Sequence, residues 1–74
     1  MDLNQINQTT HCFCDLDQDG EPLGYVIFSS LCANVKGFGN TAQKALKMQQ
    51  KNLKQAYKDY RKGKFVPEIE PLDY

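Results

Sequence analysis

The sequence lacks any hydrophobic run that approaches the roughly 20 residues a helix needs to cross a bilayer. Residues 1–8 carry no basic side chain and no continuous apolar region, so they do not have the pattern of a secretory signal peptide. These absences argue against a membrane-spanning or secreted protein. We therefore expect a cytoplasmic protein with no membrane partner.

Cysteine and histidine are also scarce, with three Cys and one His in the chain. Three cysteines allow at most one intramolecular disulfide, and cytosolic cysteines stay mostly reduced. His11 and Cys12 are neighbours on an expected strand, where successive side chains point to opposite faces, so they do not converge on one ion. We expect Cys12, Cys14 and Cys32 to be buried reduced residues, with no metal and no cofactor.

No enzymatic activity is expected. The single His has no local pattern around it that supplies a nucleophile, an orienting group and oxyanion donors, so no catalytic residue is assigned. The 74 residues suffice for one domain, taken as 1–74. A domain this small buries only about 60% of the surface of its unfolded chain, so we expect a partner or self-association to add stability, with a homodimer as the default.

The first half of the chain predicts three strands. Residues 11–16 alternate as a strand, with one face carrying Cys12, Cys14 and Leu16 and the other carrying His11, Phe13 and Asp15. Residues 23–29 form an apolar central strand, and residues 32–38 a weaker third one. Gly37 and Gly39 are expected to end the third strand by adopting conformations closed to other residues.

The turn between the first two strands is acidic. Asp15, Asp17, Asp19 and Gly20 follow the opening of a calcium-binding loop, but the twelfth position is Val26, where that loop requires a bidentate Glu. Gly tolerates positive φ and Asp bonds the local backbone, so a solvated hairpin turn is the preferred interpretation.

A long helix is expected after the third strand. Asn40 and Thr41 are both good N-caps, and Asn40 with Gln43 fits a capping box, so the helix begins at about Thr41 or Ala42. Apolar residues then recur at helical spacing and are expected to pack on the sheet: Ala42, Ala45, Leu46, Leu53, Ala56, Tyr57 and Tyr60. Gly63 is a natural residue to follow the helix end.

The predicted fold class is α+β. It has a three-stranded antiparallel sheet, one long helix packed on the sheet, and a short C-terminal edge strand at residues 65–66, in the order β-β-β-α-β. Residues 1–9 receive no assignment and are treated as an arm, and residues 68–74 are expected to be an irregular tail.

Charge is strongly segregated although the net charge is zero. Only acidic charges occur before Lys36 and after Lys64, and Asp59 is the sole acid between them. Six cations on the expected helix follow one another at spacings of three and four, which places them in one stripe: Lys44, Lys47, Lys51, Lys54, Lys58 and Arg61. Like charges at these spacings repel, so the stripe predicts a partner with negative charge: an acidic protein surface, the acidic termini of a second copy, or nucleic-acid phosphate.

The acidic turn, the strand Gly24-Tyr25-Val26-Ile27-Phe28, and the sequences Gly39-Asn40-Thr41 and Ala45-Leu46 resemble the HicB-like antitoxin domain, a degenerate RNase H-like unit. The resemblance covers roughly residues 13–67 and implies a module that binds and blocks a small toxin. Its helix is typically acidic where this one is basic. The chain ends at Tyr74, and we expect a stand-alone domain with no DNA-binding segment.

Two functions are therefore predicted. The first is a non-enzymatic protein-binding module, an antitoxin-like or phage-type inhibitor that occludes a partner protein such as a small toxin or a host protein. The alternative is a small nucleic-acid-binding protein that uses the lysine-rich stripe. The candidate partner-binding residues are the same in both cases.

Overall fold

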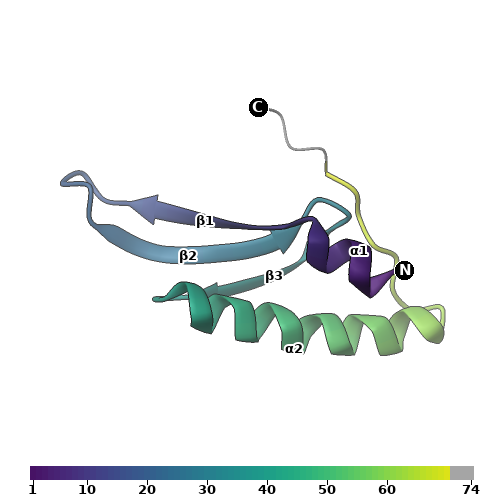
Figure 1. Ribbon diagram of the computed structural model, residues 1–74. Coiled ribbons are helices and arrows are strands. Elements are labelled where there is room, and N and C mark those ends of the chain that lie inside the picture. Colours follow the sequence, from purple (N-terminus) through teal and green to yellow (C-terminus); the bar gives the residue numbers. More distant parts are fainter. Residues whose placement is uncertain (71–74) are drawn as a thin grey trace.

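A computed structural model describes residues 1–70 of the chain. It shows an α+β fold in which a three-stranded antiparallel sheet, in the order β1-β2-β3, carries a long helix on one face (Figure 1). This part of the predicted architecture is confirmed. The elements are α1 (Leu3–Gln8), β1 (Thr10–Leu16), β2 (Pro22–Ser29), β3 (Cys32–Gly39) and α2 (Ala42–Arg61).

The predicted β1–β2 hairpin is present. Its ladder runs from the pair Thr10 and Ser29 outward, and Gly20 in the turn has a φ of 81°. The Asp17 carboxylate accepts the backbone N–H of Asp19 at 2.9 Å and of Glu21 at 2.8 Å. These local bonds fold the acidic turn, and the hairpin reaches past the start of α2 (Figure 1).

Helix α2 begins as expected at Ala42, but its cap is Thr41 alone. The Thr41 hydroxyl accepts the N–H of Lys44 at 3.2 Å, and Asn40 does not form the predicted capping box because it lies outside the cap position. At the other end Gly63 has a φ of 72°, the left-handed conformation expected of a residue that follows a helix.

Two glycines of β3 have a role that differs from the predicted one. Neither Gly37 nor Gly39 has a positive φ, and both lie within β3. A Cβ at Gly37 would overlap the backbone of α2 at Ala45 and Gln49, and a Cβ at Gly39 would lie 2.7 Å from the Ala45 nitrogen. These residues are small because the helix axis approaches the strand closely, not because the chain turns there.

The side of α2 that is buried differs from the predicted apolar stripe. The buried residues are Ala45, Gln49, Leu53 and Ala56, whereas Leu46 and Tyr60 are 43% and 40% exposed. The predicted apolar stripe is therefore wrong at its margins. Gln49 is fully buried and its amide donates to the Thr10 hydroxyl at 3.3 Å, which satisfies a polar group in the interior.

The N-terminal arm is a helix rather than an unassigned segment. The Asp2 carboxylate caps α1 by accepting the N–H of Asn4 at 2.9 Å, and Ile6 is only 2% exposed. Ile6 belongs to the main core cluster with Cys32, Val35, Leu53 and Ala56. A single buried Ile in a polar stretch gives little periodic signal, so the helix could be recognised only after packing was known.

The predicted C-terminal edge strand does not form at residues 65–66. Instead the chain crosses the beginning of β3, where the Ala33 N–H donates to the Glu68 carbonyl and the Glu70 N–H donates to the Ser30 carbonyl, both at 2.8 Å. Pro67 lacks an N–H, so a regular ladder is interrupted next to it. The irregular tail predicted for 68–74 is observed as far as residue 70, and residues 71–74 lie outside the described part.

Candidate binding surfaces

The six predicted partner-binding residues lie together on the outer side of α2. Lys47 and Lys51 each follow a buried residue by two positions, and two positions correspond to about 200° around an α-helix. The stripe is therefore opposite the sheet rather than beside the buried face. All six members are exposed: Lys44, Lys47, Lys51, Lys54, Lys58 and Arg61. We call this set the basic stripe.

The basic stripe is about 25 Å long, given the rise of about 1.5 Å per helical residue. Its C-terminal end contains a shallow hollow lined by Lys58, Arg61 and Lys62. Three cationic side chains around one hollow are suited to a carboxylate or a phosphate. Near the other end, Leu46 and Met48 lie at the two margins of the basic stripe and are 43% and 44% exposed, with the Met48 sulfur accepting the Phe38 N–H at 3.4 Å.

A second surface, which was not predicted from the sequence, is the face of the sheet opposite α2. The Phe13 and Phe28 rings stack there with centroids 5.1 Å apart, and the Lys36 ammonium lies 5.0 Å from the Phe28 centroid. Phe38 on β3 is 57% exposed on the same face. The alternation of His11, Phe13 and Asp15 placed Phe13 on this face, but it did not show that the face is uncovered.

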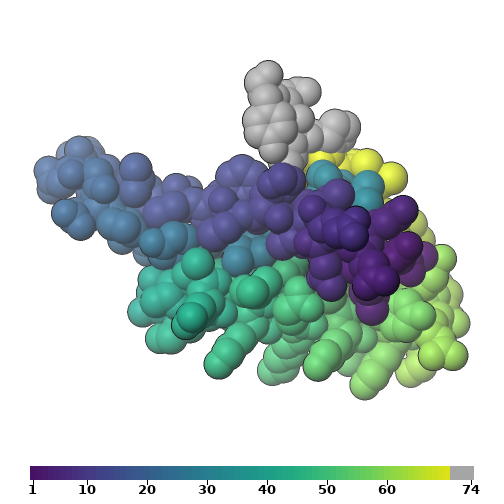
Figure 2. All heavy atoms as spheres, viewed as in Figure 1, coloured from purple at the N-terminus to yellow at the C-terminus, as the bar shows by residue number. Residues whose placement is uncertain are grey.

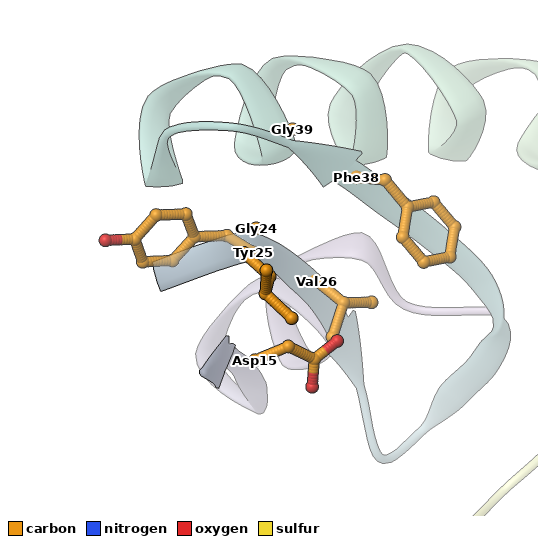
Figure 3. A pocket seen from close by; sticks show the side chains of 7 residues that line it. Asp15, Gly24, Tyr25, Val26, Phe38 and Gly39 are labelled. Atoms are coloured by element: carbon orange, nitrogen blue, oxygen red, sulfur yellow. The ribbon is translucent and has the colours of Figure 1, made fainter. Parts of the chain in front are cut away.

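A hollow at the outer end of this region is lined by residues of all three strands. Figure 3 shows Asp15, Val26 and Phe38, from β1, β2 and β3, on the same side of the sheet. This arrangement agrees with the register, in which Val26 pairs with Phe38. The hollow is open, and among the described residues Asp15 is the one charged residue in its lining.

The hairpin that carries β1 projects from the body of the molecule. In Figure 2 its blue atoms form a narrow arm beyond the green atoms of α2. Cys12 and Cys14, which we call the β1 cysteines, are exposed, and only Cys32 is buried. The prediction that all three cysteines are buried is therefore wrong for β1, because α2 packs mainly over β3 and leaves this edge uncovered.

Burial raises the pKa of the Cys32 thiol above its ordinary value of 9.0. Among residues 1–70, no three His, Cys, Asp or Glu side chains are grouped to hold a metal ion. In the same range, no helix is sufficiently long and apolar to span a membrane.

The chain was also compared with known proteins. No family model, no curated protein and no solved structure matches it.

Proposed function

We propose that the protein is a non-enzymatic protein-binding module whose basic stripe docks on an acidic surface of a partner protein and occludes it. The observation that carries this proposal is the exposure of all six cations on the side of α2 that faces away from the sheet. None of these side chains is needed to cover the core. Repulsion between neighbours at three and four residues costs a few tenths of a kcal/mol for each pair, and a negatively charged partner removes that cost.

Apolar contacts favour a protein as this partner. Leu46 and Met48 lie about 100° around the helix on either side of Lys47, at the two margins of the basic stripe, and remain nearly half exposed, although the Met48 sulfur also accepts the Phe38 N–H at 3.4 Å. Protein interfaces bury apolar as well as charged groups, and here the exposed apolar margins and the lysine stems offer apolar area beside the cations. The resemblance to HicB-like antitoxins supports an inhibitor, which would block a toxin or a host protein by covering its surface.

Nucleic acid is the second candidate, and the length of the basic stripe favours it. A row of cations about 25 Å long can follow a phosphate backbone. The overall charge argues against it, since the formal net charge is zero and the sequence pI is about 6.5. Domains that bind nucleic acid through a basic patch typically have a pI above about 9.

The experiment is a pull-down of the tagged chain from its native lysate, with and without nuclease. A protein recovered in stoichiometric amount after nuclease treatment supports the inhibitor. Recovery of nucleic acid alone, with an affinity that falls with log salt at a slope near −0.9 per phosphate on duplex DNA, overturns it in favour of the second candidate.

Matched variants assign the binding surface. Lys47→Glu with Lys51→Glu reverses two charges within the basic stripe, and Lys36→Glu with Lys64→Glu makes the same change in net charge outside it. We expect only the first pair to abolish recovery of the partner, with both pairs keeping the far-UV circular dichroism of the wild type. Equal loss in both pairs would show that net charge, not the basic stripe, governs binding.

A further inference from the structure

β1 is the open edge of the sheet. It pairs with β2 on one side only, and outside that ladder no backbone–backbone hydrogen bond within residues 1–70 involves residues 10–16. An edge strand presents a row of free N–H and C=O groups, which is a template for another strand. Natural edges are usually protected by Lys, Pro or a bulge, yet β1 contains neither residue type and its register is regular from Thr10 to Asp15.

Both faces of β1 are open as well. The β1 cysteines point to the side of the sheet that carries α2 but are exposed, and Phe13 on the other side is 39% exposed. The Phe13 ring is already held in place by its stack on Phe28, so little side-chain freedom remains to be lost on association. A partner strand paired with this edge would cover apolar area on both faces of β1.

We propose that β1 pairs antiparallel with β1 of a second copy, about a two-fold axis at Phe13, to give one continuous six-stranded sheet. Phe13 is three residues from Thr10 and three from Leu16, so this register alone pairs the whole of the strand with itself. His11 then lies opposite Asp15 of the second copy, and an imidazole N–H can donate to that carboxylate. An isologous interface repeats each such contact twice.

Neighbouring registers are less favourable. An axis at Cys14 sets Asp15 against Phe13 of the second copy, which opposes a carboxylate to an aromatic ring. An axis at Cys12 sets Phe13 against His11 and leaves Asp15 without its His partner. Only the axis at Phe13 brings the two Phe13–Phe28 stacks together into one aromatic row on the open face.

The β1 cysteines provide a direct test of the register. In the proposed pair, Cys12 lies opposite Cys14 of the second copy, with Cβ atoms about 4.5 to 5.5 Å apart. The two copies of Cys12 are diagonal neighbours, with Cα atoms about 7 to 8 Å apart. That separation is beyond the reach of a disulfide without backbone movement. Cys32 is buried and can remain in every variant.

We would therefore prepare Cys12→Ser and Cys14→Ser variants and oxidise each alone and as an equimolar mixture. A disulfide dimer is expected in the mixture and not with either variant alone. The Cys12→Ser/Cys14→Ser double variant should give none. A dimer that forms equally well from either variant alone overturns the register, and a wild-type chain that sediments as a monomer overturns the pairing itself.

Charge variants give a second readout that does not depend on oxidation. Phe13→Lys sets two ammonium groups against each other at the axis and should abolish the dimer, whereas Phe38→Lys on the same open face should leave it intact. Equal loss of the dimer in Phe13→Lys and Phe38→Lys would indicate that the two copies stack through their open sheet faces and do not pair through their edges. His11→Asp should also weaken the dimer, and the exchange His11→Asp/Asp15→His should restore it.

The β1 edge and the basic stripe are separate surfaces. Residues opposite each other in an antiparallel pair share a face, so both copies of α2 would lie on the same side of the six-stranded sheet. The dimer therefore presents two basic stripes toward one side and leaves both free. Failure of the dimer tests leaves the proposed protein partner unaffected, and Lys47→Glu with Lys51→Glu, on the outer side of α2, leaves β1 unaffected.

Discussion

Replacement of Gly37 by Ala tests how closely α2 lies on β3. The new methyl carbon would lie 2.8 Å from the Cβ of Gln49 and closer still to the carbonyl oxygen of Ala45 and the amide nitrogen of Gln49. Both of the nearest atoms belong to helix backbone, which cannot move aside as a flexible side chain can. Relief requires the helix to lift from the sheet, which also loosens the contacts of Leu53 and Ala56.

The expected loss is about 3 kcal/mol, the upper part of the range for overpacking a well-packed interior. At about 0.05 to 0.15 kcal/mol per residue, a domain of this length has a total stability of about 4 to 11 kcal/mol, so the loss is a large share. Alanine also reduces the conformational entropy of the unfolded chain, which offsets only about 0.4 to 1 kcal/mol of the expected destabilisation.

Urea unfolding followed by far-UV circular dichroism measures the effect. The matched control is Gly24→Ala, where the nearest atom to the new methyl is the Gly39 carbonyl oxygen at 3.5 Å, an ordinary contact. We expect the control to lie within about 1 kcal/mol of wild type. Similar midpoints for Gly37→Ala and the control, at equal m-values, would refute the close approach of α2.

Three further predictions concern the cap, the core and the thiols. Thr41→Ala removes the acceptor for the Lys44 N–H and should lower the free energy of unfolding by about 1 kcal/mol, measured by urea titration. Leu53→Ala should cost about 2 to 5 kcal/mol in the same assay, whereas Leu46→Ala, at an exposed position of the same helix, should cost far less. In the native state the β1 cysteines should react rapidly with a thiol reagent, and Cys32 only after unfolding. Because burial raises the pKa of the Cys32 thiol, the unfolded thiol loses its proton first, so stability should fall as pH rises past about 9.

Local signals were sufficient for most of the elements. The turn chemistry around Gly20, the β-branched and aromatic residues of β2, and the caps of α2 each depend on neighbours in the chain, and each predicted element was found at these positions. The spacing of the six cations also determined that they share one side of α2. These features follow from backbone geometry that is the same in any fold.

Features that depend on distant neighbours were missed or misread. The helix α1 has one buried anchor, Ile6, whose burial requires Leu53 and Val35 to be in place. Phe65 lies against the core without forming a strand, because the following chain bonds across the start of β3. The exposure of Cys12 could not be inferred from its alternation, since alternation gives a face but not what covers that face.

The sequence by itself determined the α+β class, the three antiparallel strands, the long capped helix and the basic stripe, because periodicity, turns and caps act over a few residues. Tertiary structure alone decided that α2 lies close over Gly37 and Gly39, mainly above β3. That placement buries Gln49, directs the basic stripe outward and leaves β1 as an open edge. The physical reason is that burial is a property of pairs of surfaces, and which surfaces meet depends on how closely two backbones can approach.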